Sequence, residues 1–186
     1  MKRTLILFLL FVFFVSNSQE RKKFTIRYIN MTSFSIAKNT ESYFSNFSKD
    51  SIRSPKGFGF DLNSIHGVRF FGIIAISAGI GIDWNVDKTF LSTPYIIDVR
   101  LFSNKSIDNC LFLYLQTGKN IKWSNSFDGN GTSSKIGLGG IFSYDDDISL
   151  FVDVFRKSKQ IQMSSKLDYG YYNIAGFGIS FGIIFN

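Results

Sequence analysis

The 186-residue sequence contains one cysteine, one histidine and two prolines, and each scarcity excludes something. A single cysteine, Cys110, can form neither an intramolecular disulfide nor a cysteine-based zinc site. A single histidine, His66, cannot build a multi-histidine metal centre. Beyond the N-terminal region no run of 18 apolar residues occurs, so no membrane-spanning helix is expected there. These absences predict a protein without cofactors or bound metal.

The N-terminal segment has the pattern of a secretory signal peptide. Lys2 and Arg3 precede an unbroken apolar run of 11 residues over 5–15, and small side chains follow at Ser16 and Ser18. An uncleaved membrane anchor would need about 20 apolar residues, so a removable signal is the better interpretation. We predict cleavage after Ser18, which leaves one domain over residues 19–186.

The positive charge of the chain is dispersed. Without Lys2 and Arg3, 19 of the 21 Lys and Arg remain against 14 Asp and Glu, a net charge of +5. The longest basic run is 21–23, which argues against a nucleic-acid partner. We expect these residues at solvated ends and loops, where they can attract anionic lipid head groups.

What the sequence has in abundance is alternation. From Ile74 to Asp83, Ile residues and one Ala alternate with Ala, Ser, Gly and Asp. Alternation with a period of two places one set of residues on each face of a β-strand. The pattern recurs and predicts eight strands, over 24–37, 57–65, 73–83, 94–102, 110–119, 134–142, 148–157 and 173–185.

The spacing of these segments favours a particular topology. The gaps between them measure 19, 7, 10, 7, 14, 5 and 15 residues, so long and short connections alternate. Outer-membrane barrels have long loops at one end and short turns at the other. We predict an all-β fold, an antiparallel up-and-down transmembrane β-barrel of about eight strands, with surface loops over 38–56, 84–93, 120–133 and 158–172.

The two faces of the strands differ in size. One is rich in Ile, Phe and Leu and is predicted to contact lipid, while the other is small and weakly polar and suits a narrow lumen. Charged residues on the lumen face are predicted to form a paired network that plugs it, because unpaired buried charges cost several kcal/mol each. The alternative is a proton or ion path. The charged set is Arg27, Asp61, Asp83, Asp98, Arg100, Lys135 and Asp153.

Several stretches carry a family resemblance. They are GFGFDLNSIHGVRFF at 57–71, ISAGIGID at 76–83, TPYIIDVRLF at 93–102, FLYLQTG at 112–118 and YNIAGFGISFGIIF at 172–185. Together they resemble the small outer-membrane β-barrel proteins of the Bacteroidota over most of 57–186. The resemblance implies a cell outer membrane location, contact with outer-membrane lipids and biogenesis through the barrel-assembly machinery. In such families that machinery reads an aromatic residue at or near the end, here Phe185.

Three motifs offer chemistry, each with a simpler interpretation. His66 is expected in a short turn, although Ser64 and Asp61 lie near enough in sequence to keep a Ser–His–acid lipid hydrolase open. Asp145–Asp147 could bind calcium but is expected to be a charged hairpin turn. Asp128–Gly131 partly matches a calcium loop, yet no acidic residue follows at its twelfth position, so a turn is predicted there too.

The sequence leaves several functions open. We favour a structural or surface-interaction barrel without enzymatic activity, whose surface ligand the sequence does not identify. A lipid-modifying outer-membrane enzyme and a small-solute channel are the alternatives. A soluble, lipocalin-like carrier is disfavoured, because a carrier needs its bulky apolar face inside the barrel.

Overall fold

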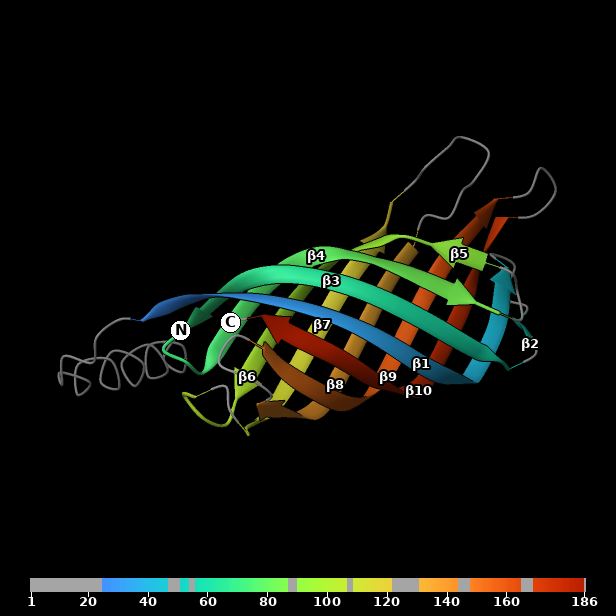
Figure 1. Cartoon of the computed structure of the whole chain (residues 1–186). Coiled ribbons are helices and arrows are strands. Elements are labelled where there is room, and N and C mark those ends of the chain that lie inside the picture. The colour runs from blue at the N-terminus through green and yellow to red at the C-terminus, as the bar shows by residue number, and fades with distance from the viewer. Residues whose placement is uncertain are drawn as a thin grey trace, which may run out of the picture.

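The chain folds into one antiparallel sheet that closes on itself (Figure 1). The computed structural model describes residues 25–46, 51–53, 56–86, 90–106, 109–121, 131–143, 148–164 and 169–185. Two short strands, β2 (Ser51–Arg53) and β5 (Phe90–Ser92), pair with β1 and β4. The eight long strands are β1 (Ile26–Asn46), β3 (Phe58–Phe70), β4 (Ile74–Asn85), β6 (Pro94–Phe102), β7 (Leu111–Asn120), β8 (Gly131–Ser143), β9 (Ile148–Ser164) and β10 (Tyr169–Phe185).

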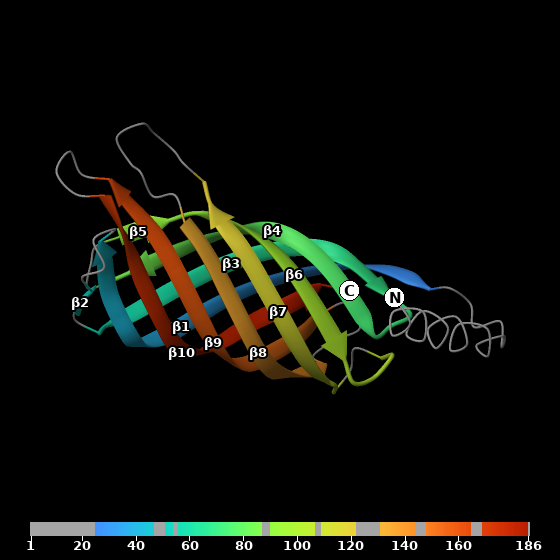
Figure 2. The same cartoon turned by 180° about the vertical axis from the view of Figure 1, so that it is seen from behind.

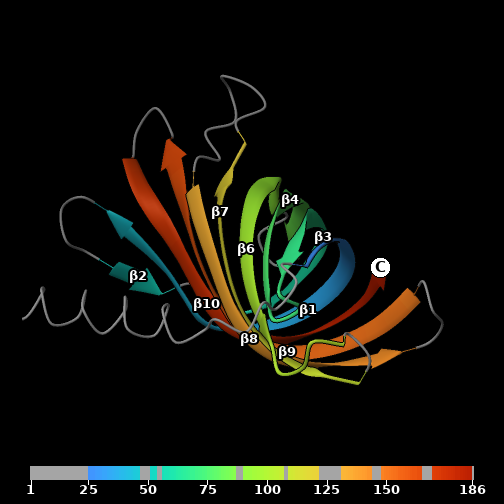
Figure 3. The same cartoon turned by 90° about the vertical axis from the view of Figure 1, so that its left-hand side faces the viewer.

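Each long strand pairs with its neighbour in sequence, and β10 returns to pair with β1. That closing seam runs from Asn30 opposite Phe185 to Asn46 opposite Gly170, with a register shift between Asn39 and Glu41. Figure 2 shows β6 to β9 crossing the barrel wall at a tilt, and Figure 3 shows the strands wrapped around a common axis. The predicted closed barrel of eight antiparallel strands is therefore confirmed. Among the described residues, no helix is long and apolar enough to cross a membrane.

Alternation sorts the side chains as predicted. Ile80 and Val154 on the outer wall are 58% and 57% exposed, whereas Ser77 and Asp153 on the inner face are each 2% exposed. Because the sheet has no free edge along its eight long strands, the backbone groups there can pair within the wall. The barrel thus presents an apolar outer surface and a lumen filled by its own side chains.

The two ends of the barrel differ. At the short-turn end, residues 71–73 join β3 to β4, β6 ends beside the start of β7, and β8 ends beside the start of β9, and the first and last described residues also lie there (Figure 1). Phe71 and Gly72 adopt positive φ angles of 53° and 70°, which the tight β3–β4 turn requires. At the opposite, long-loop end, β1 runs past the start of β3, β7 ends beside the start of β8, and β9 ends beside the start of β10.

Two of the predicted loops are shorter in the structure than the sequence indicated. β1 continues to Asn46 through most of the predicted loop 38–56, while β9 continues to Ser164 and β10 begins at Tyr169 within the predicted loop 158–172. Smaller corrections fall in the other two, since β5 lies within 84–93 and β8 begins at Gly131. Toward the long-loop end the side chains no longer alternate between apolar and polar, but the hydrogen-bonded ladder between β1 and β10 continues there.

His66 lies in β3 and not in a turn. The small polar residues and Gly67 near His66 are typical of turns, which is why a turn was predicted. The pairing of β3 with β1 and with β4 nevertheless continues through Phe70. The signal peptide at 1–18 and the calcium alternative at 145–147 fall outside the described residues. So does the calcium-loop motif at 128–131, except for Gly131, which begins β8.

Candidate functional site

The lumen gathers most of the charged residues predicted for it. Arg27 is the exception, because its side chain is exposed beside the short-turn end. It shares the inward parity of β1 but lies beyond the packed interior. The six residues that the structure places in the lumen, all buried, are Asp61, Asp83, Asp98, Arg100, Lys135 and Asp153.

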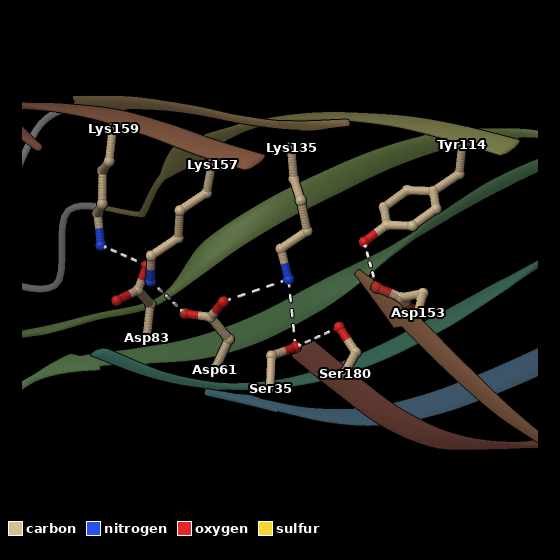
Figure 4. A network of polar contacts seen from close by, with 9 residues as sticks. All are labelled: Ser35, Asp61, Asp83, Tyr114, Lys135, Asp153, Lys157, Lys159 and Ser180. Atoms are coloured by element: carbon tan, nitrogen blue, oxygen red, sulfur yellow. Dashed lines mark hydrogen bonds and ion pairs between the residues drawn. The ribbon is translucent and has the colours of Figure 1, made fainter. Parts of the chain in front are cut away.

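The long-loop half of the lumen is built from lysines and carboxylates (Figure 4). Asp61 lies between two cations, with its Oδ2 3.2 Å from Lys135 Nζ and its Oδ1 3.2 Å from Lys157 Nζ. Nearer the rim, Lys159 Nζ lies 2.9 Å from Asp83 Oδ2 and also donates to Ser92. Every carboxylate in this half therefore has a cationic partner from the opposite wall.

This half also contains free space. A cavity of about 40 Å³ lies among Asp61, Asp83, Lys135, Lys157 and Lys159. A polar cavity of this size can hold water, since a cavity needs a volume of at least about 10–15 Å³ to hold one water molecule. We infer that the lysine–carboxylate pairs are hydrated from the long-loop end.

Lys135 connects the two halves. Its Nζ donates to Ser35 Oγ at 3.2 Å and lies 4.0 Å from the centroid of the Phe155 ring. Ser35 Oγ in turn lies 3.0 Å from Ser180 Oγ, so a hydrogen-bonded path crosses β1 and β10 (Figure 4).

The short-turn half is aromatic and closely packed. Tyr114 Oη donates to Asp153 Oδ1 at 2.9 Å, and Arg100 Nε donates to Asp98 Oδ1 at 3.0 Å. The Arg100 guanidinium lies 4.9, 4.6 and 5.4 Å from the ring centroids of Phe112, Tyr114 and Phe151. These aromatic faces contribute cation–π attraction to the buried guanidinium.

Arg69 completes the closure at the short-turn end. Its Nη2 donates to the carbonyl oxygens of Gly72 and Asn104, which belong to two different turns, and its guanidinium lies 4.4 Å from the Phe102 ring centroid. Apolar side chains fill the remaining space around it. The buried set includes Ile29, Met31, Ile65, Cys110, Ile141 and Ile184.

Sequence reasoning missed three lumen cations, Arg69, Lys157 and Lys159. All are buried, and all share the inward parity of their strands. The predicted strands ended at 65 and 157, so Arg69 and Lys159 fell outside them, whereas Lys157 was inside its strand and was overlooked. Following the inward parity along β9 through Asp153, Phe155, Lys157 and Lys159, and extending β3 in the same way, would have found all three. Among the described residues, no group of three His, Cys, Asp or Glu side chains could hold a metal ion.

The hypothetical Ser–His–acid set does not assemble with Asp61. Asp61 faces the lumen, while His66 is exposed on the outer wall. There Tyr28 Oη lies 2.6 Å from His66 Nδ1, and Ser64 Oγ lies 3.4 Å from Nε2. Asn30 and Thr32 lie opposite His66 and Ser64 on β1, so five polar residues interrupt the apolar wall.

Comparison with solved structures finds several similar barrels, of which Neisserial surface protein A supports the same architecture. The crystal structure of Neisserial surface protein A (NspA) matches with a TM-score of 0.53 at 12% identity, over 84% of this chain and 96% of that one. The N-terminal β-barrel domain of Pseudomonas aeruginosa OprF matches at 0.38, with 13% identity and 81% and 96% coverage. A de novo designed transmembrane β-barrel also matches at 0.38, with 12% identity and 83% and 93% coverage. No family model and no curated protein matches the sequence.

The class of protein follows from the fold. A closed eight-stranded barrel with an apolar outer wall, similar over nearly its whole length to NspA, is an outer-membrane-type β-barrel. At 12% identity the similarity establishes the architecture and leaves the role to be argued from the lumen and the wall.

Proposed function

We propose that this protein resides in the cell outer membrane as a closed barrel that anchors surface-exposed loops and strand ends for interaction with a partner. The observation that carries the proposal is the contrast between a wall of exposed Ile, Leu, Val and Phe and a lumen filled by ion pairs and aromatic rings. A lipid-facing wall without an open interior suits an anchor better than a conduit.

The long-loop end supplies the surface that such an anchor would present. β1, β9 and β10 continue beyond the apolar part of the outer wall toward the long-loop end. There they form a second small core, in which Phe44 packs against Ile161, Tyr172 and Ile174. This core stiffens the protruding strands. The proposed interaction surface is thus formed by the ordered strand ends.

The lumen argues against the carrier and channel alternatives. Its described cavity of about 40 Å³ is lined by charged groups, so an apolar ligand would have neither the room nor the surroundings that it needs. Steady conduction would require Arg100 and its surrounding rings to move. Membership of the Bacteroidota family and handling by the barrel-assembly machinery remain predictions.

Two measurements test this proposal. Cells expressing the full chain, separated into soluble, inner-membrane and outer-membrane fractions, should hold the protein in the outer-membrane fraction. Purified protein in planar bilayers should give no steady conductance. A stable current whose ion selectivity changes in Asp98→Asn or Lys135→Gln would make transport the leading function instead.

A second candidate, lipid hydrolysis, is favoured by the polar cluster on the outer wall. With Nδ1–H donating to Tyr28 Oη, His66 Nε2 is free to accept the proton of Ser64. Ser64 Oγ would then attack a lipid ester carbonyl, His66 would pass the proton to the departing alcohol, and water would release the fatty acid from Ser64. Tyr28 takes the orienting role first considered for Asp61.

A serine-directed phosphonate tests this candidate independently of substrate. Covalent labelling of Ser64, found by mass spectrometry and abolished in His66→Ala, would support hydrolysis, with Ser158→Ala on the same wall as the control. Absence of labelling, together with no release of fatty acid from phosphatidylglycerol vesicles, would leave the anchor as the remaining function.

A further inference from the structure

The outer wall changes from apolar to polar toward the long-loop end on several neighbouring strands. Ile36 on β1 is followed on the same face by Lys38, and Val154 on β9 by Arg156. On β8 the outward partner of Arg156 is Ile136, and Ser134 follows it. A charge within the hydrocarbon is costly, so the first outward cations mark the boundary with the lipid head groups.

At that boundary two cations flank one aromatic ring. Lys38 is the register partner of Phe177, and Phe177 is the register partner of Arg156, so the three lie side by side on β1, β10 and β9. Phe177 is 56% exposed, and Lys38 and Arg156 are exposed as well. Neighbouring strands lie about 4.8 Å apart, which sets the two cation-bearing Cα atoms roughly 10 Å apart.

The cations of this row are not neutralised within the barrel. The Arg156 guanidinium lies 5.9 Å from the Phe177 ring centroid, and neither Arg156 nor Lys38 forms an ion pair with a described carboxylate. Glu41 is the exposed acid nearest along β1, beyond the register shift. Two long cationic side chains that can converge over a ring match the charge and reach of one phosphate group.

We propose that Lys38, Phe177 and Arg156 form a binding site for the phosphate of an anionic lipid in the leaflet at the long-loop end. This inference rests on the proposed outer-membrane location. The wall directly below supplies the complementary part, because Ile36, Ile179 and Val154 are exposed where the acyl chains of that lipid would lie. A free anion would use the cations but not this apolar surface.

The test measures lipid retention on the folded full-length protein in mild detergent. Native mass spectrometry after titration with phosphatidylglycerol should show one retained molecule, with weaker retention of phosphatidylcholine, whose choline offsets the phosphate charge. Lys38→Gln combined with Arg156→Gln should weaken retention about thirtyfold, given the usual contribution of two cations near a lipid surface. Arg53→Gln combined with Lys119→Gln, which removes the same charge from exposed sites farther from this row, should retain the lipid as the wild type does.

Three outcomes would overturn the site. Equal weakening in both double variants would mean diffuse attraction to a basic rim. Displacement of the lipid by inorganic phosphate at equal concentration would mean a free-anion site. Unchanged retention in Lys38→Gln with Arg156→Gln would place the lipid elsewhere. Failure of the wild-type protein to insert into phosphatidylglycerol vesicles would instead overturn the proposed function itself, so the two failures are distinguishable.

Discussion

The two halves of the lumen neutralise charge in different ways. In the long-loop half, Asp61 and Asp83 are paired with lysines beside a cavity that can hold water. In the short-turn half, Arg100 has Asp98 as its ion-pair partner, while aromatic rings surround its guanidinium. One half has a cavity that can supply water as an additional hydrogen-bond partner, and the other surrounds its cation with aromatic rings.

This difference teaches where the barrel tolerates change. Asp98 Oδ2 and Arg100 Nη1 are buried without a hydrogen-bond partner in the described part of the chain. If either residue of the pair were removed, the other would lose the one ion-pair partner that the described residues give it. A long lysine beside a hydrated cavity can move to a new partner or to water. We expect the short-turn half to be rigid and intolerant of substitution, and the long-loop half to be adaptable.

The largest expected effect comes from breaking the enclosed pair. Arg100→Leu removes the ion-pair partner of Asp98 while retaining an apolar side chain among the rings, and should lower the free energy of unfolding by about 3–5 kcal/mol. Equilibrium unfolding of the barrel in urea with lipid vesicles measures this loss. Full recovery in Arg100→Leu combined with Asp98→Leu would identify the stranded carboxylate as the cause, and no recovery would point to lost packing.

Two glycines give a matched test of packing. A Cβ added at Gly139 would lie 2.6 Å from both Val152 O and Asp153 Cβ, whereas one added at Gly59 would lie 2.9 Å from the flexible end of Lys157. Gly139→Ala should therefore cost about 1–3 kcal/mol of stability, and Gly59→Ala well under 1 kcal/mol. The same urea unfolding assay compares them. Similar losses at both positions would contradict the contrast between the halves.

The smallest expected effect is at the hydrated rim. Asp83→Asn leaves Lys159 without its carboxylate, but Ser92 and cavity water remain available to the ammonium group. We expect a loss of about 1 kcal/mol in the same assay. A loss as large as that of Arg100→Leu would show that the cavity is dry, and the distinction between the halves would fail.

Much of the fold could be predicted because alternation is strong where one face of each strand belongs to the apolar outer wall. The predicted strand 94–102 coincides with β6, in which each inward residue from Pro94 to Phe102 is buried. Beyond Ala37 the signal disappears, since Lys38 to Ser42 are polar on both faces. Backbone hydrogen bonding to β10 continues there although the side chains are polar. Because the sequence shows no apolar–polar alternation in these strand ends, they were predicted as loops.

The alternation of residues along each strand predicted which side chains face the lumen, but it did not predict which of them form ion pairs. Parity placed Asp61 and Lys135 on one face, yet their 3.2 Å contact depends on how the closed sheet brings β3 opposite β8. Arg27 shows the reverse error, because its parity is inward but its position along β1 lies beyond the packed interior. Parity assigns the face of a residue, whereas depth and partners depend on closure.

The seam between β1 and β10 constrains how the barrel can form. It joins Asn30 to Phe185, so the sheet keeps two free edges until the first and last strands meet. Until they meet, both strands expose unpaired N–H and C=O groups, each costing several kcal/mol in hydrocarbon. A sheet of seven strands would therefore still carry two free edges, as a sheet of three does. If the barrel resides in a membrane as proposed, we expect entry into the bilayer and closure of the ring to be coupled, with the final strand required for both.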